Sequence, residues 1–341
     1  MHKKLWKLFS IGFLIQTTFI GLSACSFNES TLTTNNKSTT NSQSDSNHST
    51  SIVFNQSIKI NGSGAHNDGN TLTINKSGTY TISGSCSSGQ IIIDADNQNV
   101  KVILSNLKLN NPNGPAIMIK GGHVELARAK DTSSSLSDGG QSSACISSSI
   151  AFTLSGSGTL NLTGTVNNGI KIAGNLIIED GDLNIKAVNN GIENTQTDTV
   201  ITLVDGDVKT NGNGSGIFTN GSIKIKAGNL FAYGYQYGLS AQNTIDIEGG
   251  TLFAYGSLNP SASLNSVQHT LNTRLLMNAG SQLVIKTGDK TLLDTTITQS
   301  ASQFIYSATT LSDKATYDIY LDSQLQAALK VDQFETTNKQ K

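Results

Sequence analysis

The sequence predicts an all-β fold, namely a single-stranded parallel β-helix with a β-rich C-terminal capping region. Three observations support this prediction. First, the chain repeats in coils of about 22–25 residues, which start at Ala144, Gly169, Gly191, Gly216 and Gly238. Second, each coil holds short segments of alternating apolar and polar residues, separated by Gly, Asn and Asp, as expected for strands joined by turns. Third, a fixed period of this size is typical of a solenoid, and no convincing helical period competes with it.

Earlier and later segments extend the predicted solenoid. Strand-like stretches precede the clear repeats at 79–84, 89–95, 100–104, 107–109 and 115–120. Beyond about residue 260 the repeat fades, although T-R-L-L-M, Q-L-V-I-K and Y-D-I-Y-L still resemble strands, and S-Q-L-Q-A-A-L-K-V fits a helix or a strand. A solenoid needs its ends covered. We therefore predict the β-helix domain over 51–264 and a capping region with a tail over 265–341.

The N-terminus has the features of a secretory signal. A basic start, M-H-K-K-L-W-K, precedes an apolar run from Leu8 to Leu22 that is too short to span a membrane and ends in small residues. The following L-S-A-C resembles a bacterial lipobox, which implies removal of residues 1–24, a diacylglycerol on Cys25 and an extracytoplasmic, membrane-anchored protein. An ordinary signal peptide with a chance cysteine is the alternative. Residues 25–50 are rich in Ser, Thr and Asn, so we expect a disordered tether.

The charge content of the chain limits the classes of molecule that it could bind, and its cysteines bear on a disulfide. The chain carries 23 basic and 24 acidic residues, and only 14% of its residues are charged. Binding to a phosphate backbone needs clustered Lys and Arg, which are absent after the signal, so we do not expect a nucleic-acid partner. Neutral or weakly charged partners and a monomer fit better. Cys86 and Cys145 could pair outside the cytoplasm, but two free thiols are the default.

Several motifs together resemble the bacterial carbohydrate-binding domain family of secreted right-handed β-helix proteins. The matching elements, in order, are G-T-Y-T-I-S-G, G-Q-I-I-I-D-A, V-I-L-S-N-L-K-L-N-N-P-N-G-P-A-I, S-L-S-D-G, L-S-G-S-G-T-L-N-L, the N-N-G-I coil starts and G-G-T-L-F-A-Y-G. The resemblance covers roughly residues 55–285. It implies a right-handed single-stranded parallel β-helix, a polysaccharide partner of the cellulose or pectate type, and in some members calcium held by acids after D-G-I coil starts.

The coil starts of this chain differ from the family pattern that binds calcium. The residues before the coil-start glycines are Asn168, Asn190, Ser215 and Tyr237, and only Asp198 keeps an acid in the stretches that follow. Calcium prefers six to eight oxygen ligands, several of them carboxylates. Repeated D-G-D motifs supply other acids that the solenoid would stack, namely Asp180, Asp182, Asp205 and Asp207. Asp-Gly is also an ordinary tight-turn dipeptide. Calcium is therefore possible, with a turn role as the alternative.

Aromatic residues gather at the end of the repeats, although they make up only 6% of the chain. In the aligned coils, Phe231 and Phe253 share a column with asparagines and Lys209, and Tyr233 and Tyr255 share one with Lys186. Because side chains alternate between the faces of a strand, these columns should face outward. We expect a carbohydrate-binding face made of Phe231, Tyr233, Tyr235, Tyr237, Phe253, Tyr255, Lys186 and Lys209. The alternatives are a capping region that folds over the rings, or a protein interface.

The sequence shows no catalytic constellation. The only arginines after the signal are Arg128 and Arg274, and neither lies in the aromatic or D-G-D columns. Paired carboxylates occur only in tight turns, and the histidines are scattered. We therefore expect a non-catalytic surface lipoprotein that binds polysaccharide along a solenoid face. A structural or adhesive protein with a protein-binding aromatic face is the second hypothesis, and a calcium-dependent polysaccharide lyase-like enzyme is the third.

Overall fold

The computed structural model describes residues 48–258, 263–331 and 334–335. The predicted signal peptide, the predicted lipidation site Cys25 and nearly all of the predicted tether lie outside these residues. Within the described ranges, no helix has the length and hydropathy that crossing a membrane requires. All the regular elements described there are strands, which confirms the all-β prediction.

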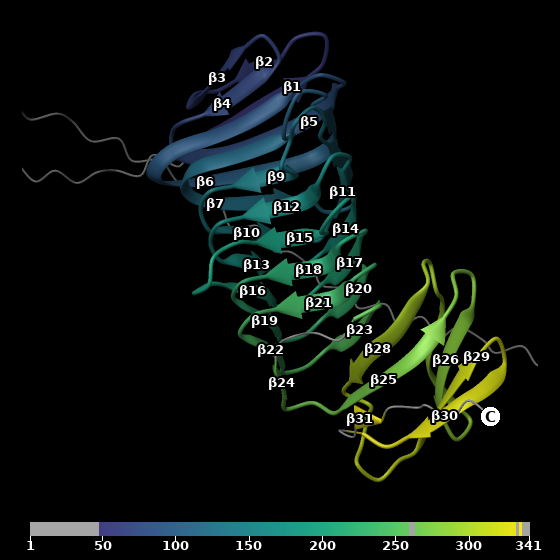
Figure 1. Ribbon diagram of the computed structural model, residues 1–341. Helices are drawn as coiled ribbons and strands as arrows, with labels where there is room; N and C mark the ends of the chain where they lie inside the picture. The colour runs from purple at the N-terminus through teal and green to yellow at the C-terminus, as the bar shows by residue number, and fades with distance from the viewer. Residues whose placement is uncertain (1–47, 259–262, 332–333, 336–341) are drawn as a thin grey trace, which may run out of the picture. The chain divides into compact units, whose positions relative to one another are not determined.

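The solenoid winds through three parallel sheets, and each coil contributes one strand to each of them (Figure 1). The first sheet contains β8 (Ser133–Ser137), β11 (Thr159–Gly164), β14 (Asp182–Ala187), β17 (Asp207–Gly212), β20 (Asn229–Gly234) and β23 (Thr251–Gly256). The second contains β9 (Ala144–Ser148), β12 (Asn168–Ile172), β15 (Ile192–Asn194), β18 (Ser215–Thr219) and β21 (Tyr237–Ala241). The third contains β10 (Phe152–Ser155), β13 (Leu176–Ile178), β16 (Val200–Leu203), β19 (Ser222–Ile225), β22 (Thr244–Ile247) and β24 (Ser263–Ser266).

The N-terminal coils are built from longer strands that bend from one sheet into the next. They comprise β1 (Ser49–Phe54), β2 (Lys59–Asn61), β3 (Ala65–Asp68), β4 (Thr71–Ile74), β5 (Gly78–Cys86), β6 (Gln90–Asn110) and β7 (Ile117–Arg128). The end of β6 pairs in parallel with both the end of β5 and β8. The first sheet therefore continues into these early coils.

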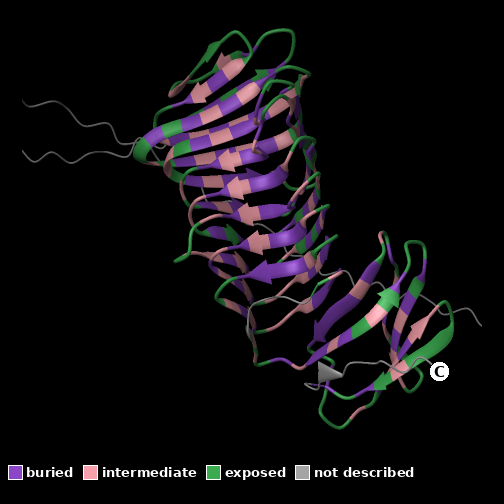
Figure 2. Cartoon of the chain, viewed as in Figure 1, coloured by how far each residue is buried: buried purple, intermediate pink, exposed green. Residues whose placement is uncertain are grey.

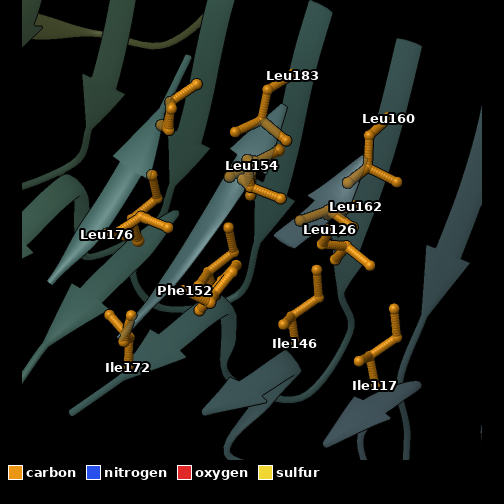
Figure 3. Packing of buried hydrophobic residues seen from close by; sticks show 14 of the residues in the cluster. Ile117, Leu126, Ile146, Phe152, Leu154, Leu160, Leu162, Ile172, Leu176 and Leu183 are labelled. Carbon is orange, nitrogen blue, oxygen red and sulfur yellow. The ribbon is translucent and has the colours of Figure 1, made fainter. Parts of the chain in front are cut away.

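Inward columns of aliphatic residues form the core of the solenoid. Val124, Phe152 and Leu176 are successive register partners in the third sheet, and all three are buried. The buried and half-buried residues alternate along the strands (Figure 2), and the inward side chains stack from coil to coil (Figure 3). Because every coil buries its inward residues against its neighbours, the core grows with the number of coils.

The C-terminal region is also made of strands, as predicted. It comprises β25 (Thr270–Met277), β26 (Gln282–Thr287), β27 (Lys290–Thr296), β28 (Ala301–Ala308), β29 (Tyr317–Leu321), β30 (Gln324–Leu329) and β31 (Phe334–Glu335). Strand β28 pairs antiparallel with β23, the last strand of the first sheet, and with β25. Strands β27, β26, β29 and β30 form a separate antiparallel sheet in that order. The ambiguous stretch near residue 325 is a strand.

Candidate functional site

The strand register of the first sheet matches the predicted columns. Leu160, Leu183, Val208, Leu230 and Leu252 are successive register partners, and all are buried in the solenoid core. The neighbouring outward column runs through Asn161, Asn184, Lys209, Phe231 and Phe253. The next outward column runs through Thr163, Lys186, Asn211, Tyr233 and Tyr255. The prediction that both columns leave the solenoid on its outer side is confirmed.

The expectation of an exposed aromatic patch is wrong for three of its rings. Tyr233, Phe253 and Tyr255 are only 3%, 1% and 8% exposed. They belong to a second hydrophobic cluster, separate from the solenoid core, whose other buried members come from the C-terminal region. The Phe253 ring lies 6.0 Å from the Phe304 ring of β28, measured between centroids. The capping region therefore covers the rings, which was the alternative interpretation of the sequence.

Polar contacts fasten the two buried tyrosines to the segment between β27 and β28. The hydroxyl of Tyr233 donates a hydrogen bond to Oε1 of Gln299. The hydroxyl of Tyr255 lies 2.8 Å from Oγ1 of Thr298 and accepts a hydrogen bond from the Thr298 backbone amide at 3.3 Å. Burial, aided by the neighbouring tyrosines, raises the pKa of Tyr233 to about 12, so its hydroxyl stays protonated near neutral pH.

The remaining aromatic candidates differ in exposure. Phe231 is half-buried, and its ring centroid lies 6.3 Å from that of Phe253. Tyr237 is half-buried at the start of β21. Tyr235 is 61% exposed at the corner between β20 and β21. Only Tyr235 thus fits the expectation of a fully accessible ring.

A cleft of about 670 Å³ lies over the first sheet, beside the buried rings. Its lining comes from the two outward columns, from buried neighbours in the sheet and from the C-terminal segment, and comprises Asn161, Leu162, Thr163, Asn184, Ile185, Lys186, Lys209, Thr210, Asn211, Phe231, Tyr233, Phe253, Tyr255, Thr295, Thr296 and Thr298. Six of the eight candidate binding residues therefore line one cleft. Thr295, Thr296 and Thr298, which form its C-terminal wall, lie in no repeat or motif, so they were not predicted from the sequence.

The floor of the cleft presents amide and ammonium groups. The side-chain amide of Asn184 donates to Oδ1 of Asn161 at 3.1 Å, and Asn161 donates in turn to Oγ of Ser133 at 3.1 Å. This amide ladder holds the side chains in fixed orientations across neighbouring strands. Lys186 and Lys209 are both exposed. The floor therefore offers many hydrogen-bond donors and acceptors.

The cleft lysines make no salt bridge with the described residues. In the part of the chain that the structure describes, the salt bridges join Lys101 to Glu125, Lys171 to Glu193 and Lys224 to Glu248, all on the second or third sheet. None of them involves Lys186 or Lys209. The ammonium groups on the cleft floor are thus available to a ligand.

The acidic candidates serve as turn residues. Oδ1 of Asp180 accepts a hydrogen bond from the backbone amide of Gly181 at 2.6 Å, and Asp205 makes the same contact with Gly206 at 2.8 Å. The two glycines have φ values of 78° and 94°, which suit Gly in a tight turn.

The other three acidic candidates are not gathered into one cluster. Asp182 and Asp207 are register partners at the start of β14 and β17, whereas Asp198 is exposed in the turn before β16. Over the described ranges, no group of three or more His, Cys, Asp or Glu side chains is arranged to hold a metal ion. Cys86 and Cys145 are free thiols.

Comparison with known proteins identifies the family. The model of the family described as "Carbohydrate-binding domain-containing protein" matches residues 68–315, which is more than half of the chain. This chain belongs to the carbohydrate-binding domain-containing protein family.

A relative and a solved structure accompany the match to this carbohydrate-binding domain family. A carbohydrate-binding domain-containing protein of Acetivibrio thermocellus is 31% identical over 130 residues, which make up 34% of this chain and 45% of that protein. This chain thus matches less than half the length of that relative. The structure of a polysaccharide lyase-like protein from C. thermocellum, a gadolinium derivative, superposes with a TM-score of 0.55 and 22% identity, over 64% of this chain and 97% of that one. At this identity the likeness supports the fold alone.

Proposed function

We propose that this carbohydrate-binding domain protein binds a polysaccharide in the cleft of the first sheet and does not cleave it. The single observation that carries the proposal is the composition of the cleft. An ordered floor of amides and unpaired ammonium groups lies beside a wall of aromatic rings and threonines. Sugars present hydroxyl groups at their edges and apolar C–H faces, so they suit a surface that combines such donors with aromatic carbon.

The non-catalytic part of the proposal rests on the same lining. None of the described residues lining the cleft is Asp, Glu or His, so a pair of carboxylates for glycoside hydrolysis is missing there. A lyase needs a base that is deprotonated near neutral pH. The raised pKa of Tyr233 makes its hydroxyl a poor base.

Arg128, one of the two arginines beyond the signal, is likewise a poor lyase base. It is 2% exposed, and its guanidinium donates to the backbone carbonyls of Ser155 and Asp180. These bonds tie the guanidinium to the end of β10 and to the turn before β14. Its role is therefore structural.

We also propose a location for the protein, based on the lipobox-like sequence at its N-terminus. A lipid on Cys25 and the Ser/Thr/Asn-rich segment behind it would hold the domain outside the cytoplasm, within reach of extracellular polysaccharide. Radiolabelled palmitate should enter the wild-type protein and not a Cys25→Ala variant. Labelling of both, or of neither, would contradict this part.

A binding assay tests the main proposal. The full-length protein in mild detergent is incubated with insoluble cellulose, chitin, xylan and polygalacturonate, in calcium or in EDTA. We expect at least one polymer to retain the protein, and the double variant Lys186→Ala/Lys209→Ala to lose at least tenfold in affinity. Lys120→Ala/Lys226→Ala removes two other exposed lysines and is the matched control.

The outcomes separate the alternatives. Equal affinity of both double variants would exclude the cleft, and loss of binding in EDTA would direct attention to the acidic turns. Sustained release of reducing ends or of unsaturated uronates by the pure protein would contradict the non-catalytic assignment.

A further inference from the structure

The cleft is one part of a longer polar track on the first sheet. A second hollow of about 320 Å³ lies on the preceding coils, and Thr163 lines both hollows. The outward column of the cleft continues into this hollow, because its successive register partners are Ser85, Lys108, Ser135, Asn161, Asn184 and Lys209. All six are polar. With strands about 4.8 Å apart, these six positions span roughly 24 Å.

Hydrogen bonds also order the second outward column in the early coils. The hydroxyl of Ser137 donates to Oδ1 of Asn110 at 2.7 Å. These residues and Thr163 are successive register partners in the parallel pairing of β6, β8 and β11. The early part of the track therefore has the same small, hydrogen-bonding character as the cleft floor.

The track is closed at its C-terminal end. The outward columns change to aromatic residues at β20 and β23, where Tyr233, Phe253 and Tyr255 are buried and Phe231 is half-buried. The strand next to β23 is β28, where Phe253 faces Tyr306 and Tyr255 faces Phe304, both of them buried. Thr295, Thr296 and Thr298 line the same end of the cleft. A polymer lying along the columns has no further polar strand to follow beyond this wall.

We infer that the track receives the end of a glycan chain, whose terminal sugar abuts the threonine and aromatic wall while the following sugars lie over the earlier coils. The inference rests on the proposed function and deepens it by naming the part of the ligand that is recognised. Phe231, which is half-buried, offers its accessible ring carbon to the terminal sugar. An internal segment of a long chain would have to turn away from the sheet at the wall.

A side opening provides the competing path for a chain. A third hollow of about 390 Å³ adjoins the cleft through Lys186 and Asn211 and extends to Val188, Asn213 and Gln299 at the corner of the coils. A chain that left through it could bind by an internal segment. Asn213 is exposed there, so Asn213→Trp would fill the side opening without disturbing the core.

Counting bound protein per chain end tests the inference. Long and short size fractions of polygalacturonate and xylan, with ends counted by a reducing-sugar assay, are titrated calorimetrically into the full-length protein. Insoluble cellulose and chitin are compared before and after partial endo-hydrolysis. We expect one protein per chain at either length, so that binding per gram rises in proportion to the number of ends. Labelling the reducing end with 2-aminobenzamide identifies which end is bound: binding lost on labelling means the reducing end, and binding retained means the non-reducing end.

Other outcomes overturn the inference in distinguishable ways. Binding per gram that does not change with chain length would leave the proposed function intact and refute recognition of ends. No binding to any of the four polymers would overturn the proposed function and the inference with it.

Variants then test the direction of the chain. Ser135→Trp, at an exposed position far from the wall, should lower the affinity for long oligosaccharides at least tenfold and leave the affinity for the shortest bound oligosaccharides within twofold of the wild type. Asn213→Trp should change neither. Loss of all binding in Asn213→Trp would show that the chain passes through the side opening and would refute the inference.

Discussion

Replacing Phe253 with alanine should weaken the attachment of the C-terminal region to the solenoid. Phe253 is 1% exposed and lies on β23, the strand that pairs with β28. Its ring centroid is 5.1 Å from that of Tyr255, 6.0 Å from that of Phe304 and 6.3 Å from that of Phe231. The ring is thus a central contact between the last coils and the strands that cover them.

The size of the effect follows from burial and from the ring contacts. Truncation of a buried Phe to Ala costs about 3–5 kcal/mol, from lost transfer free energy and from the cavity that remains. All three centroid distances fall within the range of favourable aromatic pairs, which add about 0.5–1.5 kcal/mol each. Since such contributions are not additive, we expect a loss of about 4 kcal/mol in the free energy of unfolding of the contact region.

Urea denaturation measures this loss. Trp6, the only tryptophan, lies in the predicted signal peptide, so near-ultraviolet circular dichroism of the tyrosines and limited proteolysis are the suitable probes. Lys209→Ala is the matched control, because Lys209 occupies the same outward column but is exposed, and its loss should change stability by about 0.5 kcal/mol at most. A loss in Phe253→Ala no larger than that of the control would refute the reasoning that this ring is packed between two layers.

Three further predictions concern other parts of the chain. The pKa of Tyr233 is about 12 in the folded protein and near 10 when unfolded, so its contribution to stability should hold below pH 10 and disappear between pH 10 and 12. Over that range the melting temperature of Tyr233→Phe should therefore fall less steeply with pH than that of the wild type. A thiol reagent should modify half-buried Cys86 in the native protein and buried Cys145, whose pKa burial raises, only in denaturant; equal rates would contradict this. Gly206→Ala should lower the melting temperature more than Gly280→Ala. Both glycines have φ near 90°, but a Cβ at Gly206 would lie 2.6 Å from the backbone oxygen of Gly181, whereas one at Gly280 would meet no atom; similar melting temperatures would argue against that close approach.

The sequence allowed the coil architecture and the strand register to be predicted. The reason is physical: inward positions of a solenoid need aliphatic residues at every coil, so Leu160, Leu183 and Leu252 mark the same position in each repeat. Once the inward column is known, the alternation of a strand assigns the neighbouring columns to the outer face. The outward direction of Lys186 and Lys209 followed from this rule.

The coverage of the outer face could not be predicted in the same way. Pairing of β28 with β23 joins residues about fifty positions apart through a region without a repeat, and no local pattern fixes such a contact. Thr298 and Gln299, which hold the tyrosine hydroxyls, have no sequence signal for the same reason. An outward column in a solenoid is therefore exposed only where no other part of the chain returns to it.

The change from Lys209 to Phe231 within one column separates the two roles of the first sheet. The last strand of a parallel solenoid leaves a row of unpaired backbone groups, which would pair with another chain if it were left open. Strand β28 satisfies that edge, and the aromatic residues at β20 and β23 supply the apolar surface that holds the covering region in place. Among the described residues, none before Phe231 belongs to the second hydrophobic cluster, and the outward columns of the preceding coils stay polar. The rings that first suggested a binding face are therefore chiefly the foundation of the wall that bounds it, and the binding surface is the polar track that leads to them.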